Sequence, residues 1–178
     1  MKGGVNMEKI TNAEFDKVFR LMEMSFPPEE RRIYEEQKAL FFEKHYRVYG
    51  IRGDDSDSVI AFMAVWEWED LLFIEHFAVD PSFRNRGLGK HMLCEIVSIS
   101  DKPVCLEVEL PDNEIAKRRI AFYERCGFVL NEYPYIQPSM AKGCPPVPLK
   151  IMTYGRAITD SEFEKMKDTL YTYVYNSK

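Results

Sequence analysis

The stretch LLFIEHFAVDPSFRNRGLGKHMLCEIV, residues 71–97, decides the fold of this chain of 178 residues. Leu71–Val79 is an apolar run that indicates a buried strand, and Asp80-Pro81 predicts a turn after it. From Leu88 onward, apolar residues recur at helical spacing. A strand, a loop with glycines and a helix N-terminus bind anions well, because backbone N–H groups and the helix dipole converge there. The stretch therefore predicts an anion-binding site.

Composition and charge set the class of protein. With 46% hydrophobic and 13% aromatic residues, the chain is expected to form one globular domain over residues 1–178, with 1–6 as a loose tail. The 24 basic and 29 acidic side chains give a net charge of −5. This acidic balance argues against nucleic acid as a partner.

Targeting and redox signals are weak throughout the chain. Residues 1–9 lack the apolar segment of a signal peptide, and no uncharged apolar run is long enough to cross a membrane. The four cysteines show no CxxC spacing and are expected to be reduced thiols. The three histidines are isolated, so no structural metal is expected. These features predict a cytoplasmic protein without a membrane partner.

Apolar periodicity divides the chain into strands and helices. Strands are expected at 7–10, 46–51, 59–66, 71–79, 104–110, from 128 onward and at 149–154. Helices are expected after a capping box at Thr11, over 29–44, 88–98 and 114–126, and after a second capping box at Thr159. Residues 133–148 contain five prolines and are expected to form a loop. This order predicts an α/β fold with one central mixed sheet.

Three kinds of phosphate-binding loop are compared with RNRGLG, residues 84–89. A Walker loop needs GxxxxGK[ST], but His91 follows Gly89-Lys90 and no glycine lies five residues before Gly89. A dinucleotide fingerprint needs GxGxxG, and Met92 occupies the position of its third glycine. The acyl-CoA pyrophosphate pattern [R/Q]xxGx[G/A] agrees at every defined position. The third kind of loop is therefore favoured.

With this loop in place, the sequence resembles the GNAT superfamily of N-acetyltransferases. EHFAVDP at 75–81 resembles the fourth strand of that family, and LEV at 106–108 resembles its fifth. FYERCGF at 122–128 resembles the motif at the end of a later helix, and the order and spacing agree over about residues 59–130. Many relatives carry Asn seven residues before the motif tyrosine, where this chain has Ala116. The pair Arg118-Arg119 is a hypothetical substitute contact to the phosphates of the cofactor.

The resemblance implies a mostly antiparallel mixed sheet, flanked by helices, whose fourth and fifth strands splay apart. It implies acetyl-CoA as the acetyl donor, with its pantetheine arm between these strands and its pyrophosphate on the loop N–H groups. Residues 131–178 would be a C-terminal extension of the shared core. The expected cofactor-binding residues are Phe77, Val79, Arg84, Arg86, Gly87, Leu88, Gly89 and Lys90.

A tyrosine and two carboxylates are the candidates for acid–base catalysis. Tyr123 matches the family's motif tyrosine, which implies a general acid toward the departing thiolate. Glu75 and Glu107 are candidates for the general base that takes a proton from the amine. Glu75 is expected on the same strand face as Phe77, with His76 packed on the opposite face. Either carboxylate could instead orient the substrate without taking a proton.

The expected function is acetyl transfer from acetyl-CoA directly to a primary amine in a ternary complex. The alternative is an acyl-CoA-binding regulatory module without turnover. The sequence does not distinguish small-molecule from peptide acceptors, and it leaves the acyl group open. A homodimer through the amphipathic C-terminal helix is a further expectation.

Overall fold

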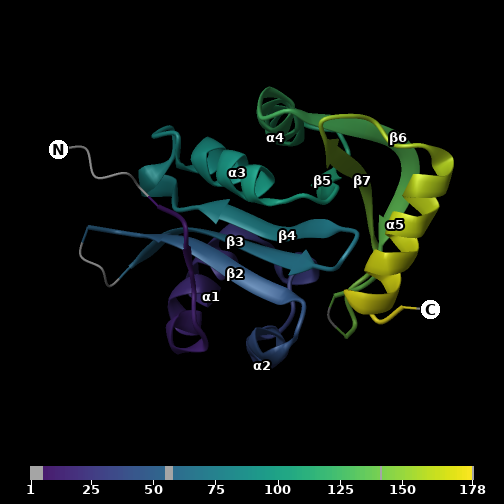
Figure 1. Ribbon diagram of the computed structural model, residues 1–178. Coiled ribbons are helices and arrows are strands. Elements are labelled where there is room, and N and C mark those ends of the chain that lie inside the picture. The colour runs from purple at the N-terminus through teal and green to yellow at the C-terminus, as the bar shows by residue number, and fades with distance from the viewer. Residues whose placement is uncertain (1–5, 55–57, 141, 178) are drawn as a thin grey trace.

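The structure of the protein is a computed structural model, which describes residues 6–54, 58–140 and 142–177 (Figure 1). The expected loose tail at 1–6 lies, apart from Asn6, outside these residues. The strands are β1 (Glu8–Lys9), β2 (Tyr46–Arg52), β3 (Val59–Glu67), β4 (Leu72–Val79), β5 (Val104–Glu109), β6 (Phe128–Gln137) and β7 (Val147–Tyr154). The main helices are α1 (Phe15–Ser25), α2 (Tyr34–Ala39), α3 (Leu88–Ile99), α4 (Glu114–Arg125) and α5 (Asp160–Tyr173).

All seven strands join one sheet, in the order β1-β2-β3-β4-β5-β7-β6. Neighbouring strands run antiparallel except β4 and β5, which are parallel. Helices α3 and α4 lie on one side of the sheet, whereas α1 and α2 lie on the other (Figure 1). The predicted fold class, a mostly antiparallel mixed sheet flanked by helices, is confirmed. No helix in the described residues is long and apolar enough to span a membrane.

Each face of the sheet has its own apolar core, because successive residues of a strand point to opposite sides. In β3, Phe62 packs into the core shared with α1 and α5, to which α5 contributes Phe163 and Leu170. The next residue, Met63, packs into the core shared with α3 and α4. Both β3 side chains are fully buried. Coverage on both faces explains why β3 reads as a continuous apolar run.

The predicted loop at 133–148 is wrong at both of its ends. Strand β6 continues through Pro134, and β7 begins before Pro148, so the connection is limited to residues 138–146. Pro134 is tolerated because the register of β6 against β7 is interrupted around it, and because β6 is an edge strand. Pro148 lies beyond the last residue pair between β7 and β5, so one of its edges has no partner strand.

The predicted helix at 29–44 is broken into three short pieces. They are η2 (Pro28–Glu30), α2 and η3 (Leu40–Phe42), where η marks a 3-10 helix. The backbone is extended at Arg31 and at Ile33, which interrupts the helical hydrogen bonds. The break directs Arg32 inward, where only 8% of the residue is exposed. Its guanidinium reaches β4, so a run of charges that predicts a solvated helix contains one buried cation.

Candidate active site

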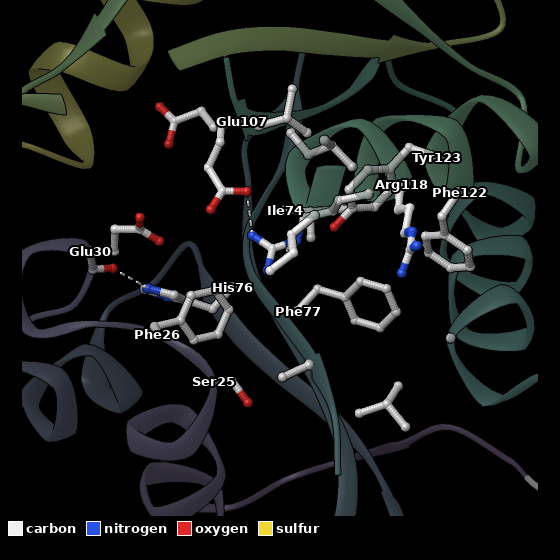
Figure 2. Close-up of a pocket in the computed structure, with 18 of the residues that line it drawn as sticks. Ser25, Phe26, Glu30, Ile74, His76, Phe77, Glu107, Arg118, Phe122 and Tyr123 are labelled. Atoms are coloured by element: carbon white, nitrogen blue, oxygen red, sulfur yellow. Dashed lines mark hydrogen bonds and ion pairs between the residues drawn. The ribbon is translucent and has the colours of Figure 1, made fainter. Parts of the chain in front are cut away.

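A pocket of 590 Å³ lies where β4 and β5 separate (Figure 2). The two strands pair over only three residues each, from Leu72 with Val104 to Ile74 with Leu106. Both strands continue past these residues without further pairing between them. The predicted splay of the fourth and fifth strands is confirmed. Backbone groups that face the gap lack a partner strand and are left for a ligand.

The loop after β4 leads directly into α3. Gly87 is the N-cap of α3 and has φ +82°, in the left-handed region that favours glycine. A Cβ at Gly89 would lie 3.3 Å from ring atoms of both Phe77 and Phe122, so the wall of the pocket leaves little room for a side chain there. The first N–H groups of α3 have no acceptor within the helix. Such groups are able to bind an anion at this end of the pocket.

The predicted cofactor residues fall into two groups. The residues that line the pocket are Phe77, Val79, Arg84, Gly87, Leu88 and Gly89. Arg86 and Lys90 are exposed and do not line it. The Arg86 guanidinium lies 4.9 Å from the centroid of the Phe83 ring, whereas Arg84 Nε donates to the Val79 carbonyl oxygen at 3.1 Å. Arg84 is thus fixed at the pocket, and direct contact of Arg86 and Lys90 with a cofactor stays a prediction.

Tyr123 presents a hydroxyl to this pocket from α4. Figure 2 shows its ring beside Phe122 and Arg118. Tyr123 is 8% exposed, and its hydroxyl forms no hydrogen bond within the part of the chain that the structure describes. Burial raises the pKa of Tyr123 to about 12, and the nearby Arg119 offsets only part of this effect. The hydroxyl therefore stays protonated at neutral pH.

Strand β4 contains a bulge at Glu75, which its apolar pattern did not predict. Ile74 and His76 pair with consecutive residues of β3, so Glu75 has no partner there. The expectation that Glu75 shares a face with Phe77, opposite His76, is wrong. Phe77 packs toward the α3–α4 core, whereas Glu75 Oε2 lies 3.6 Å from His76 Nδ1. A bulge inserts one residue and thereby changes the alternation of faces.

Glu75 is a buried carboxylate paired with a buried cation. Its side chain is 1% exposed, and Arg32 Nη1 donates to Oε1 at 2.7 Å. Arg32 Nη2 donates to the Val174 carbonyl oxygen at 2.8 Å, which fixes the guanidinium. Burial alone would raise the pKa of Glu75, but Arg32 and His76 outweigh it and lower the pKa to about 2. Glu75 therefore stays ionised and is a weak base.

Glu107, on β5, is a buried carboxylate surrounded by neutral donors. It accepts hydrogen bonds from the hydroxyls of Tyr135 and Tyr175 and from Gln137 Nε2, the last two at 2.7 and 3.1 Å. Burial raises the pKa of Glu107 to about 7, and the two hydroxyls offset this only in part. Glu107 can therefore exchange a proton near neutral pH.

Three residues around these carboxylates were missed by sequence reasoning. Arg32 belongs to the charged run EERR at 29–32, which resembles any solvated surface. Gln137 lies in the segment expected to be a loop, and Tyr175 follows the last helix. None of them matches a motif, so no local signal could have found them. The carboxylates that they contact lie 30 to 68 residues away in the chain.

Comparison with known proteins covers most of the site but not all of it. Residues 15–128 match the acetyltransferase (GNAT) family, which is well over half of the chain. The chain belongs to the GNAT acetyltransferase family. The membership agrees with the resemblance drawn from its strand, loop and helix motifs. Residues beyond 128, which include the donors to Glu107, lie outside the matched region.

Two solved structures and one curated protein show how similar the chain is to known proteins. A putative GNAT-family acetyltransferase from Bacteroides thetaiotaomicron is 34% identical, with a TM-score of 0.87 over 98% of this chain and 100% of that one. Glucosamine 6-phosphate N-acetyltransferase of Trypanosoma brucei brucei is 39% identical over 59 residues, 33% of this chain. The match spans only 38% of that relative. Arabidopsis thaliana NAA60 in complex with acetyl-CoA shares the fold, at 15% identity and a TM-score of 0.63 over 84% of this chain and 97% of that one.

Asn113 is the nearest asparagine to Ala116, the position at which many GNAT relatives carry Asn. Asn113 caps α4, because its Oδ1 accepts from the Ala116 N–H at 2.9 Å. It therefore serves the helix rather than replacing the missing family Asn. Both neighbouring arginines line the pocket, but Arg119 pairs with Glu109 at 2.7 Å, whereas Arg118 has no ion-pair partner among the described residues. Arg118 alone of this pair is left for a cofactor phosphate.

Proposed function

We propose that the protein is an acetyl-CoA-dependent N-acetyltransferase that transfers acetyl directly to a primary amine in a ternary complex. One observation carries the proposal. A single pocket joins an anion-binding helix N-terminus, a gap between splayed strands, a protonated tyrosine and two buried carboxylates. Acetyl transfer needs these four parts together: a phosphate anchor, a slot for the thioester arm, an acid and a base.

In this proposal, backbone groups at the start of α3 and in β4 make most of the contacts to the cofactor. The N–H groups at the start of α3 hold the pyrophosphate, with Arg84 and Arg118 adding charge at the rim. The pantetheine arm occupies the gap between β4 and β5 and pairs with backbone groups of Phe77 and Val79. An N–H group of the same strand stabilises the oxyanion that forms as the amine attacks. Acetyl-CoA bound to NAA60, which has this fold, is consistent with the arrangement.

Tyr123 is proposed as the proton donor to the leaving group. As the C–S bond breaks, negative charge develops on the sulfur of coenzyme A. A hydroxyl with a pKa of about 12 keeps its proton at neutral pH and shares it with the thiolate through a hydrogen bond. The absence of any other partner for this hydroxyl among the described residues leaves it free for that contact.

Glu107 is the better supported of the two candidate bases. Its pKa of about 7 lets it take a proton from an ammonium group, directly or through one water, whereas Glu75 at about 2 would bind a proton weakly. The nitrogen lone pair then attacks the thioester carbon and the C–N bond forms. As the C–S bond breaks, the nitrogen loses a second proton, which through water replaces the one that Tyr123 gives to the sulfur. Glu75 contributes a fixed negative charge that favours a cationic acceptor.

The proposal is tested by binding and by turnover. A thermal-shift series should show stabilisation by acetyl-CoA and none by NADH. Thiol release should then be measured with polyamines, aminoglycosides, hexosamine phosphates and peptides as acceptors. Stabilisation without thiol release from any acceptor would favour the regulatory module instead, and stabilisation by NADH alone would contradict the family-based cofactor.

Two substitutions test the assigned roles once an acceptor is found. Tyr123→Phe and Glu107→Gln should each lower kcat by about 10²- to 10⁴-fold, with little change in acetyl-CoA affinity. The matched control is Tyr154→Phe, because Tyr154 is 44% exposed and does not line the pocket. The wild-type rate should rise with pH through about 7, and Glu107→Gln should remove that rise. Unchanged kcat in either variant would remove its residue from the mechanism.

A further inference from the structure

Four glutamates line the pocket between β4 and β5, and three of them have partners within the chain. Glu75 and Glu109 each pair with an arginine, at 2.7 Å in both cases. Glu107 accepts hydrogen bonds from two tyrosines and a glutamine. Glu30 is the fourth, and no hydrogen bond or ion pair reaches its carboxylate within the residues that the structure describes. Glu30 is therefore the carboxylate of the pocket that is left for a ligand.

The backbone holds Glu30 at the pocket while its side chain stays unpaired. Glu30 ends η2, and its carbonyl oxygen lies 2.9 Å from His76 Nε2, which ties it to β4. The residue is half-buried rather than enclosed, so a ligand in the pocket can reach its carboxylate. Burial raises the pKa of Glu30 and the nearby Glu109 raises it further, whereas Arg119 offsets only part of this. A bound cation would supply the positive charge that the chain does not provide.

Glu30 lies on the same side of the pocket as the proposed base. Figure 2 shows Glu30 and Glu107 on one side, opposite Phe122 and Tyr123. Strand alternation agrees, because Val108 packs into the α3–α4 core and its neighbour Glu107 points to the other face of the sheet. Coenzyme A is an anion and cannot balance a carboxylate. A cation beside Glu30 must therefore belong to the acceptor.

Gln137 is a second, independent sign of a hydrogen-bond donor on this side of the pocket. It lines the pocket, is 5% exposed, and its Nε2 donates to Glu107 and to the Tyr175 hydroxyl at 3.1 and 3.0 Å. Its Oε1 has no partner among the described residues. An amide oxygen can only accept, and buried acceptors are normally paired. This side of the pocket thus has acceptors that the chain does not match with donors.

Strand β5 sets the spacing between the base and the unpaired charge. Glu107 and Glu109 are two residues apart and pair with β7 without a register shift, so both lie on one face, about 7 Å apart. Glu30 is close enough to Glu109 for that charge to raise its pKa. A cation held at Glu30 thus lies roughly 6–7 Å from a nitrogen at Glu107. Two nitrogens joined by four or five methylene groups span about 6–7.5 Å, at about 1.25 Å per bond.

We propose that Glu30 binds a second cationic group of the acceptor, so that the preferred acceptors are diamines with four or five methylene groups between their nitrogens. This inference rests on the proposed function and adds Glu30 as a specificity-determining residue. One nitrogen reaches Glu107 and the thioester and is acetylated, while the other stays protonated at Glu30. A phosphate or carboxylate at that position would be repelled, and an alkyl group would leave Glu30 unbalanced. The second charge thus selects among primary amines of similar length.

The experiment compares acceptors of equal length with and without the second charge. Thiol release at saturating acetyl-CoA gives kcat/KM for 1,4-diaminobutane and for n-pentylamine, in which a methyl group replaces one ammonium. The diamine should have a kcat/KM at least about tenfold higher. The nitrogens of 1,2-diaminoethane span only about 3.75 Å, so it should have no such advantage over n-propylamine. A ratio near one for the longer pair, or an equal advantage in the shorter pair, would overturn the proposal.

Three variants assign the preference to Glu30. Glu30→Gln should lower the ratio of kcat/KM for the diamine over n-pentylamine to about one, because the amide has no charge. Glu30→Asp keeps the charge on a shorter side chain, so it should retain a preference that moves toward 1,5-diaminopentane. Glu29→Gln is the matched control, since Glu29 is the adjacent acid and does not line the pocket, and it should keep the wild-type ratio. A preference that survives Glu30→Gln, or is lost equally in Glu29→Gln, would overturn the proposal.

Failure of this inference is distinguishable from failure of the proposed function. Equal kcat/KM for 1,4-diaminobutane and n-pentylamine would overturn the inference and leave the transferase intact. If no amine releases thiol, the proposed function fails, and calorimetry on the protein loaded with coenzyme A still tests the second-cation site. Binding of the diamine at least about tenfold tighter than n-pentylamine, lost in Glu30→Gln, would support the site. Equal affinities would overturn it.

Discussion

Glu75 and Glu107 lie on neighbouring strands and are both buried, yet their protonation is opposite. Glu75 has a pKa of about 2, because Arg32 outweighs the effect of burial. Glu107 has a pKa of about 7, because its donors Tyr135, Tyr175 and Gln137 are neutral. Neutral hydrogen bonds oppose desolvation less than a full charge does. The charge of the partner, more than the depth of burial, decides which carboxylate can act as a base.

The two environments also come from different parts of the chain. Arg32 belongs to the segment that matches the family, between α1 and α2. The donors to Glu107 come from β6, which holds Tyr135 and Gln137, and from Tyr175 just after α5, all outside the matched region. The matched region therefore supplies the cation beside Glu75, whereas residues after 128 supply the hydrogen-bond donors to Glu107. Predictions can be made for each environment separately.

The largest expected effect follows removal of the cation. Arg32→Met should lower the free energy of unfolding by about 3–5 kcal/mol, because it leaves Glu75 buried and without its counter-charge. Urea unfolding at pH 7 measures this loss. Arg20→Met is the control, since Arg20 is exposed, and it should change stability by less than about 0.5 kcal/mol.

A double-mutant cycle sharpens this result. Arg32→Met combined with Glu75→Gln should be less destabilising than the sum of the single changes, because no unpaired charge remains. Additive losses would mean that the two side chains do not interact as the 2.7 Å contact indicates.

The next effect concerns the pH dependence of stability. The pKa of Glu107 is raised from 4.5 to about 7, so its stabilising contribution is present below 4.5 and is lost as pH rises through 7. The pKa of Glu75 is lowered from 4.5 to about 2, so its contribution is present above 4.5 and is lost as pH falls toward 2. The two carboxylates should therefore have slopes of opposite sign.

Urea unfolding of wild type and variants across pH measures these slopes. Between pH 4.5 and 7, wild type should lose about 3 kcal/mol relative to Glu107→Gln, at about 1.4 kcal/mol per pH unit. Below pH 4.5, wild type should instead lose stability relative to Glu75→Gln. If the free energies of unfolding of wild type and both variants changed in parallel with pH, the pKa values of Glu75 and Glu107 would not be shifted in opposite directions.

The smallest effect concerns a single donor to Glu107. Tyr175→Phe removes the hydroxyl that donates to Glu107 and accepts from Gln137, so it should cost about 1–2 kcal/mol of stability while raising the pKa of Glu107 further. The pH at which the transfer rate rises should move upward accordingly. Tyr173→Phe is the control on the same helix end, because Tyr173 is 58% exposed, and it should leave that pH unchanged. An equal shift in both variants would exclude a specific role for Tyr175.

Local features were predictable because nearby residues decide them. The glycines at 87 and 89, the turn after β4 and the capping boxes at Thr11 and Thr159 act over a few residues, and the structure places them as expected. The order of strands and helices along the chain followed from apolar runs and apolar periodicity. Tyr123 was found through a motif, and the structure brings it to the pocket.

Features that depend on distant partners were not predictable. The bulge at Glu75 shows only in the pairing with β3, so strict alternation placed Glu75 on the face of Phe77 instead of the face of His76. Pro134 predicts the end of a strand unless β6 is known to be an edge strand. The sequence also could not rank the two bases, since it contains no sign that Arg32 turns inward.

The sequence by itself determined the anion loop, the strand-and-helix order and the membership of the GNAT family, because short-range spacing encodes backbone geometry. Only the tertiary structure decided which buried carboxylate carries a charge and which accepts a proton. That outcome depends on electrostatics between groups tens of residues apart, in surroundings from which water is excluded.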